Sequence, residues 1–260
     1  MEPHAFVAEL YRRMSLRPQQ PAPIQSWSQI AASAVVLQSE RHYAPLLPPH
    51  RGAAILDIGF GGGWFLAACI KLGYTNLFGA EFGISGKEYI RQWSPAIKPL
   101  LNIESNIGDL LAGWKESFDL IHLSHVIEHI PKYSLLYVVD SLFWALKPGG
   151  TLLLRTPNME APCANSSMFV TLAHEYGFVG SNLNSLLTIC SFEQVRFHQF
   201  RVYHPSFKQR VGQALRAPIL KWNQLKHRLF GVNYGGQFDM ELIVSARRGN
   251  LQPFFDVKYK

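Results

Sequence analysis

A cluster of glycines follows a short apolar run near residue 55, and its composition suits the binding of a ligand. The stretch AAILDI, residues 53–58, is followed by Gly59, Gly61, Gly62 and Gly63. Glycine has no Cβ atom, so a turn rich in glycine lets the backbone lie directly against a ligand. Backbone N–H groups at the start of the next helix also favour an anion. The pattern therefore predicts a strand, a ligand-binding turn and a helix.

The residues after the turn exclude two common phosphate-binding motifs. A P-loop needs Gly-Lys-Ser/Thr after the glycines, whereas Gly63 is followed by Trp64 and Phe65. A dinucleotide fingerprint, counted from Gly59 and Gly61, needs its third glycine at position 64. That glycine lets the helix pack closely on the strand, so tryptophan cannot replace it. What remains is the pattern Asp57-x-Gly59-x-Gly61-x-Gly63.

Two acids follow later predicted strands, where they could contact a nucleoside. Glu81 ends the strand predicted over 76–81, and a carboxylate there can accept hydrogen bonds from both ribose hydroxyls. The alternative for Glu81 is a surface acid at a strand end. Asp109 follows the third predicted strand, and the alternative for Asp109 is a helix N-cap. For Asp109 the two roles are compatible.

The elements that position these residues alternate along the chain. Apolar runs predict five early strands: 53–58, 76–81, 100–104, 118–124 and 151–157. Helices are predicted between and after them: 63–73, 85–92, 132–146 and 181–190. Lys147-Pro148-Gly149-Gly150 is expected to end the third of these helices, and residues 158–180 read as irregular. Two further strands are predicted at 192–203 and 237–248. The order favours an α/β fold with a doubly wound, mostly parallel seven-stranded sheet and an antiparallel edge strand pair.

Two segments lie outside this alternation. Residues 1–50 contain one helical stretch and a proline-rich connection, so we expect an N-terminal helical arm or lid. Residues 51–260 then form the main domain, with an insertion at 204–236 between the last two strands. Within the insertion, 206–231 has six Lys/Arg and no Asp or Glu, and apolar residues recur at near-helical spacing. We expect Pro218 to kink this helix.

The glycine pattern resembles motif I of the class I S-adenosylmethionine-dependent methyltransferases. SFDLIHLSHVIEHIP (117–131) and FWALKPGGTLLLRTPN (143–158) resemble later segments of the family, and the second is typical of ubiquinone-biosynthesis-type and sugar-modifying members. HEYGFVGSNLNSLLTICSFEQV (174–195) resembles the segment that follows. The resemblance covers about 52–203 and 237–248. It implies a Rossmann-like fold and S-adenosylmethionine as the cofactor.

The resemblance assigns roles to particular residues. It implies that Asp57 organises the turn or reaches the cofactor's ammonium group, while Glu81 binds the ribose. The whole set of residues implied in cofactor binding is Asp57, Gly59, Gly61, Gly63, Glu81, Phe82, Asp109, Leu110 and Ser124. Phe82 would flank the adenine, and Asp109 would lie near its amino group.

Histidines in the later segments are candidate bases. A hydroxyl acceptor must lose its proton, and histidine can take it near neutral pH. We expect His129 and His174 to be catalytic, with Glu128 and Glu175 as partners. The alternatives are a structural histidine that caps the next helix for His129 and an ordinary loop histidine for His174.

The stretch HVIEH, residues 125–129, also raises the question of a metal. Related enzymes hold Mg²⁺ with Glu-x-x-Glu-His, whereas position 125 here is histidine. Hard cations prefer oxygen ligands, so we expect no metal. A softer divalent ion held by His125, Glu128, His129 and His174 is the alternative.

Charge, hydropathy and cysteine content indicate the partners and the compartment of the protein. The net charge is +7 and the pI about 9.4, which favours anionic partners. The segment at the start is not a signal peptide, no run of residues reads as a membrane span, and three scattered cysteines fit a reducing compartment. We therefore expect a cytoplasmic protein. Contact of 206–231 with the inner face of an anionic membrane is an open alternative to packing of that helix on its own domain.

The sequence thus predicts an S-adenosylmethionine-dependent methyltransferase. The first expectation for the reaction is O-methylation of a saccharide or lipid-linked glycan hydroxyl in polysaccharide biosynthesis. The alternative acceptor is a small quinone-type or natural-product hydroxyl, and RNA ranks after it. The alternative without catalysis is a partner subunit that binds the cofactor. No nucleic-acid-binding module is recognised, so nucleic acid is not the expected partner. The oligomeric state is not predicted.

Overall fold

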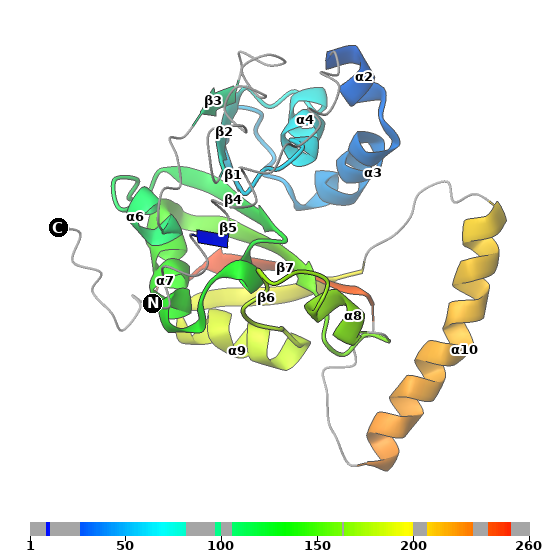
Figure 1. Ribbon diagram of the computed structural model, residues 1–260. Helices are drawn as coiled ribbons and strands as arrows, with labels where there is room; N and C mark the ends of the chain where they lie inside the picture. The colour runs from blue at the N-terminus through cyan, green and yellow to red at the C-terminus, as the bar shows by residue number, and fades with distance from the viewer. Residues whose placement is uncertain are drawn as a thin grey trace.

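The strand before the glycine turn is buried on both faces, and this burial dictates a three-layer architecture. Every residue of β1 (Ala54–Ile58) is buried. Leu56 and Ile58 belong to one apolar core, whereas Ile55 belongs to another. Successive side chains of a strand point to opposite faces, so both faces of the sheet must be covered. The computed structural model in Figure 1 describes residues 9–10, 27–81, 97–99, 106–162, 164–199, 207–230 and 239–250.

The described strands form one seven-stranded sheet in the order β3-β2-β1-β4-β5-β7-β6. The strands after β1 are β2 (Asn76–Ala80), β3 (Ile97–Pro99), β4 (Phe118–Ser124), β5 (Leu146–Pro157), β6 (Phe192–His198) and β7 (Glu241–Arg248). The first five are parallel, and β7 lies antiparallel between β5 and β6. This topology confirms the predicted Rossmann-like, doubly wound sheet with its antiparallel edge pair.

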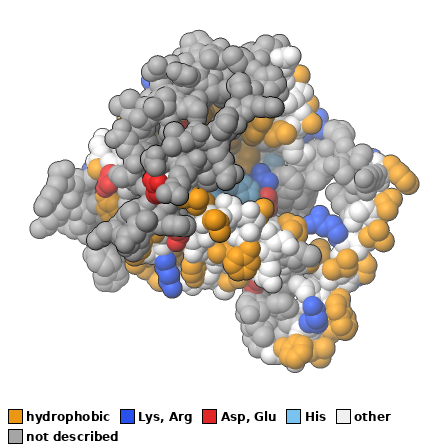
Figure 2. Space-filling view, viewed as in Figure 1, with side chains coloured by type: hydrophobic (Ala, Val, Ile, Leu, Met, Phe, Trp, Pro, Cys, Tyr) orange, Lys and Arg blue, Asp and Glu red, His pale blue; other side chains and the backbone are white. Residues whose placement is uncertain are grey.

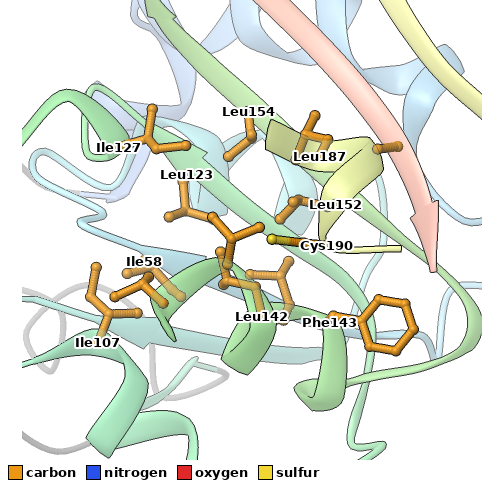
Figure 3. Packing of buried hydrophobic residues seen from close by; sticks show 14 of the residues in the cluster. Ile58, Ile107, Leu123, Ile127, Leu142, Phe143, Leu152, Leu154, Leu187 and Cys190 are labelled. Carbon is orange, nitrogen blue, oxygen red and sulfur yellow. The ribbon is translucent and has the colours of Figure 1, made fainter. Parts of the chain in front are cut away.

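Helices cover both faces of the sheet (Figure 1). One face is covered by α2 (Trp27–Ala32), α3 (Ala34–Tyr43) and α4 (Trp64–Lys71), and the other by α6 (Ile107–Leu111), α7 (Leu135–Ala145) and α9 (Gly180–Ile189). Figure 3 shows the core under α6, α7 and α9, which also contains Ile58. In this core, Leu142 and Phe143 of α7 lie near Leu152 of β5 and Leu187 of α9. Shorter elements are η1 (Ala44–Leu46), η2 (Ile127–His129), η3 (Lys132–Ser134) and α8 (Ala164–Met168), and α10 (Phe207–Leu229) lies in the insertion.

Three sequence-based elements differ from the described structure or lie partly outside it. The described part of the third strand is Ile97–Pro99, which was not predicted, and the predicted range 100–104 lies outside the described residues. Pro99 argues against a strand at this position, because proline cannot donate a hydrogen bond, but proline is tolerated on an edge strand such as β3. Residues 147–150 belong to β5 rather than preceding it. The strand begins at Leu146, which pairs with Phe118, and the register shifts between Phe118 and Leu120, because Leu120 pairs with Thr151. The stretch 158–180, predicted as irregular, contains α8.

The remaining predicted elements are confirmed in part. The helix predicted over 85–92 lies outside the described residues, as do the ends of the strands predicted over 192–203 and 237–248. In the N-terminal arm, α3 packs on α4, with its N-cap Ser33 accepting a hydrogen bond from the Val36 N–H. In the insertion, α10 runs as one helix through Pro218. Among the helices that the structure describes, none is both long and apolar enough to cross a membrane.

We predict that core packing on α7 dominates the stability of the domain. Leu142 is fully buried in the core, whereas Leu136 on the same helix is 43% exposed. Leu142→Ala should lower the free energy of unfolding by about 2–5 kcal/mol, because it removes apolar contacts and leaves a cavity. Leu136→Ala should change it by about 1 kcal/mol or less, since little area is buried there. Urea denaturation of both variants checks this, and equal losses would contradict it.

Candidate active site

The glycine turn has the backbone geometry that its sequence predicts. Gly59, Gly61 and Gly63 all have positive φ angles, of 68°, 49° and 70°. L-residues with side chains rarely adopt this left-handed region. The Gly59 N–H donates to the Ala80 carbonyl of β2, and the Gly63 N–H donates to the Phe60 carbonyl, both at 2.7 Å. The turn is therefore held against β2 while the rest of it projects beyond the sheet.

Two contacts connect this turn to neighbouring strands. The Gly61 N–H donates to Glu81 Oε2 at 2.7 Å, so the carboxylate predicted to bind ribose lies directly at the turn. On the other side, a Cβ atom at Gly59 would lie 2.4 Å from Val126 Cγ2. Val126 follows β4, so the glycine turn and the residues after β4 form one continuous surface at the carboxyl edge of the sheet. This is the edge where open α/β sheets bind ligands.

Asp57 lies inside the protein rather than on this surface. Its carboxylate accepts a hydrogen bond from His122 Nδ1 at 2.7 Å, and both side chains are buried. The His122 ring stacks on Phe65 with ring centroids 3.8 Å apart. Burial raises the pKa of the Asp57 carboxyl, and the bonded imidazole opposes that rise. Of its two predicted roles, organisation of the turn fits this position better than contact with a ligand ammonium.

The other predicted cofactor residues lie at ends of neighbouring strands and helices. Asp109 is exposed in the first turn of α6 and accepts a hydrogen bond from the Tyr137 hydroxyl at 2.8 Å. The N-cap of α6 is Asn106, so the alternative N-cap role for Asp109 is wrong. Leu110 is half-buried beside it, and Ser124 ends β4. Phe82 lies outside the described residues.

A buried carboxylate organises the residues after β4. Glu128 is 2% exposed; Oε2 accepts a hydrogen bond from the Thr156 hydroxyl at 3.0 Å, and Oε1 lies 3.2 Å from His125 Nδ1. Its backbone carbonyl accepts hydrogen bonds from the N–H groups of Glu175 and Tyr176. One residue thus connects the β4 loop, the end of β5 and the segment before α9.

His125 lies between two carboxylates as an imidazolium. Its φ angle is 56°, and its backbone N–H donates to the Arg155 carbonyl at 2.8 Å. Nδ1 donates to Glu128, and Nε2 lies 3.2 Å from Glu241 Oε1 of β7. Hydrogen bonds to Glu128 and then Glu241 raise the pKa of His125 to about 9. Burial alone would raise the pKa of Glu241, but hydrogen bonds from His125 and Arg155 lower it to about 2.

The two predicted catalytic histidines lie together. The rings of His129 and His174 have centroids 4.7 Å apart. His129 Nδ1 donates to the Ala173 carbonyl at 2.9 Å, and His174 Nδ1 donates to the Met168 carbonyl at 3.0 Å. In a neutral imidazole with its proton on Nδ1, the basic lone pair is on Nε2. Burial lowers the pKa of His129, which keeps its imidazole neutral near pH 7.

The same cluster bears on the metal question. Glu128, His129 and His174 each offer one ligand atom, and these atoms lie within 4.8 Å of one another. One carboxylate and two imidazoles suit a borderline ion such as Zn²⁺ better than Mg²⁺. The fourth residue of the alternative set, His125, lies outside this group of three and pairs with Glu128 and Glu241 instead. The expectation of no metal stays a prediction.

Comparison with known proteins identifies the family. A family model described as "Methyltransferase domain" matches residues 26–207, most of the chain. The chain belongs to the class I S-adenosylmethionine-dependent methyltransferases. The matched range begins within the N-terminal arm, so a domain boundary at residue 50 stays a prediction.

Two curated methyltransferases match part of the chain. The ubiquinone biosynthesis O-methyltransferase of Chelativorans sp. (strain BNC1) is 30% identical over 110 residues, 42% of each chain. The protein of the same name from Bartonella bacilliformis is 29% identical over 112 residues, 43% of this chain and 44% of its own length. The chain therefore spans less than half the length of the curated relatives it matches.

Solved methyltransferase structures share the fold. A methyltransferase from Archaeoglobus fulgidus has a TM-score of 0.58 at 16% identity and covers 85% of this chain and 96% of its own. The 1,6-didemethyltoxoflavin-N1-methyltransferase of Burkholderia thailandensis, solved with its acceptor and S-adenosylhomocysteine, has a TM-score of 0.59 at 15% identity. It covers 96% of this chain and 92% of its own. At this identity the likeness concerns the fold alone.

S-adenosylmethionine is the cofactor of this family, and the glycine turn of the chain fits that group. At Gly61, the Gly59 carbonyl at 4.0 Å is the one atom of the described residues near the position of an added Cβ, so these residues leave the backbone there open to a ligand. The Glu81 carboxylate, which is predicted to bind ribose, lies next to it, and Gly61 is exposed. These residues would hold the cofactor at the carboxyl ends of β1 and β2.

Sequence reasoning missed the residues that complete this site from distant strands. Thr156, Arg155 and Glu241 come from β5 and β7 and are joined to the β4 loop by the contacts described above. The local signal for Arg155 and Thr156 is a pair of polar residues at the carboxyl end of the apolar strand LLLRTP. The pairing of Arg155 with Ile243 across the antiparallel strands places Glu241 nearby, and that register cannot be derived from either segment alone.

We predict that Gly59 is required for cofactor binding for a steric reason. Gly59→Ala would place a methyl group 2.4 Å from Val126 at a φ angle of 68°, so the turn must shift. The affinity for S-adenosylhomocysteine, measured by calorimetry, should fall by about tenfold or more. Gly73→Ala is the matched control, since Gly73 has a φ angle of 87° but no atom of the described residues lies within 4 Å of an added Cβ. That variant should lose about 1 kcal/mol of stability and keep its affinity. Equal affinity loss in both would contradict the steric mechanism.

We also predict that deprotonation of His125 lowers the free energy of unfolding at alkaline pH. Its pKa is raised from 6.5 to about 9 in the folded protein, so its contribution is complete below pH 6.5 and lost as the pH rises through about 9. Denaturant titrations between pH 6 and 10 should show this loss in the wild type. His125→Gln should lower stability at pH 6 and flatten the profile over that range. An unchanged slope in the variant would show that another group titrates.

Proposed function

We propose that this methyltransferase transfers a methyl group to a hydroxyl oxygen, with His129 as the general base. The observation that carries the proposal is the histidine pair, fixed by backbone carbonyls beside the loop that touches the glycine turn. His129 lies three residues after Val126, the residue in contact with Gly59. A base at this position lies next to the residues that would hold the methyl donor.

The chemistry then divides between positioning and proton removal. When bound, the cofactor supplies an electrophilic methyl group, whose bond to sulfur breaks as the bond to the acceptor oxygen forms. In-line displacement requires the acceptor to be held in one orientation. His129 Nε2 would take the hydroxyl proton, and the Ala173 carbonyl would hold the ring in place through Nδ1. His174, with its ring against that of His129, would orient the acceptor.

The acceptor proposed from the sequence is a saccharide or lipid-linked glycan hydroxyl. The names of the two curated relatives support the other candidate, a phenolic hydroxyl of a quinone-type precursor. The two acceptors differ in acidity, because a phenol has a pKa of about 10 and a sugar hydroxyl is far less acidic. Loss of the base should therefore slow methylation of a sugar more than methylation of a phenol.

We predict that His129→Gln lowers kcat by about 10²–10⁴-fold because it removes the base. The affinity for S-adenosylhomocysteine should stay unchanged, since the glycine turn and Glu81 are intact. Radiolabelled methyl transfer into a panel of phenolic and saccharide acceptors measures the rate. His50→Gln, at an exposed histidine outside the site, is the matched control.

Several outcomes would decide against this proposal. Wild-type protein that binds S-adenosylhomocysteine but methylates no hydroxyl acceptor in the panel would contradict the proposed reaction. A normal rate in His129→Gln would remove its role as base. Because no metal is expected, EDTA should leave the rate unchanged, and a rate restored only by Zn²⁺ would assign the cluster of Glu128, His129 and His174 to an ion instead.

A further inference from the structure

Helix α10 exposes a long apolar stripe. Its residues Phe207, Leu215, Trp222 and Leu229 are 82%, 64%, 59% and 71% exposed. At about 100° per residue, these positions fall within one third of the helix circumference. Figure 2 shows hydrophobic side chains along this helix, with Lys and Arg side chains among them. An exposed apolar stripe of this length marks a surface that contacts something else.

Basic residues lie along one edge of the stripe. Arg210, Lys221 and Arg228 are exposed, and their spacing places them together beside the apolar residues. The segment 206–231 contains no acidic residue. The partner of this surface must therefore offer both an apolar region that the stripe can enter and negatively charged groups that the basic residues can contact.

A second exposed apolar group lies on the neighbouring part of the domain. Phe169, Val170 and Leu172 are 80%, 74% and 78% exposed in the loop that follows α8. A cavity of about 520 Å³ lies between α8 and α10, with Ala164, Ile219 and Trp222 among its lining residues. The exposed loop follows α8 and leads to His174, whose Nδ1 donates to the Met168 carbonyl. Helix α10 and α8 therefore flank one opening, and the exposed loop begins at the end of α8.

We propose that α10 and the loop at residues 169–172 form a docking surface for an anionic lipid bilayer. A basic amphipathic helix lies in the interface with its apolar stripe among the acyl chains and its basic edge at the headgroups. A second copy of the chain would bring two such basic helices together, and their charges would repel. RNA would satisfy the charge but not the Phe, Leu and Val side chains. The proposal does not depend on which hydroxyl the enzyme methylates.

Co-sedimentation with vesicles tests the proposal. The full chain should bind vesicles of phosphatidylcholine with phosphatidylglycerol and bind pure phosphatidylcholine vesicles far less. Raising the salt from about 0.1 M to about 1 M should weaken binding, because the Debye length falls from roughly 10 Å to 3 Å. No binding to the anionic vesicles at low salt would overturn the proposal.

Matched variants test whether the apolar stripe and the basic edge of α10 bind the vesicles, as distinct from any effect of adding negative charge elsewhere on the surface. Leu215→Glu/Trp222→Glu should weaken binding by about tenfold or more, because charges replace side chains that enter the bilayer. Leu136→Glu, at an exposed leucine of α7, should have no effect. Arg210→Glu/Lys221→Glu/Arg228→Glu should weaken binding by about tenfold or more, while Lys115→Glu/Lys132→Glu/Arg196→Glu, with the same net charge, should weaken it less.

Two measurements distinguish membrane docking from misfolding and from self-association. S-adenosylhomocysteine should bind every variant with wild-type affinity, which shows that the domain is folded independently of any activity. Size-exclusion chromatography reports self-association. A dimer in the wild type that the Leu215→Glu/Trp222→Glu variant loses would assign the stripe to a second copy and overturn the proposal, as would equal effects of the matched charge variants.

Discussion

The site depends on the burial of the Glu128 carboxylate. A charge removed from water must be met by hydrogen bonds and an opposite charge, and each such partner is thereby fixed in place. For Glu128 these partners are the Thr156 hydroxyl on β5 and the His125 imidazolium. The backbone carbonyl of the same residue holds the segment at 175–176. The proposed acceptor side of the site is thus built around one buried charge, whereas the proposed cofactor side is built from backbone geometry.

The conformation of the glycine turn could be predicted because its signals are local. Three glycines at alternate positions need positive φ angles, and these angles alone define the turn. The acceptor side could not be predicted to the same extent, because its contacts join residues far apart in sequence. His125 and Glu241 are brought together by an antiparallel pairing, and the local sequence around His125 raised only the question of a metal and gave no sign of an ion pair. Sequence identified His129 and His174 separately, but only the fold places their rings in contact.

The errors in the predicted elements have similar physical causes. Ile97–Pro99 is a strand because β2 offers it a parallel partner, and its edge position leaves the proline harmless. Lys147–Gly150 joins a strand because Leu146 already pairs with Phe118, although the residues themselves are typical of a turn. In both places tertiary pairing overrides local propensity. The length and periodicity of α7, by contrast, determine that helix from its own sequence.

The insertion that carries α10 leaves and rejoins the sheet at nearly the same point, because His198 of β6 pairs with Ile243 of β7. The conformational entropy lost in closing such a loop grows only with the logarithm of its length, by about 0.6 kcal/mol for each doubling. Residues can therefore be added, removed or exchanged between these two strands at little cost to the folding of the sheet. The surface chemistry of this insertion can therefore change while the glycine turn stays under its own separate constraint.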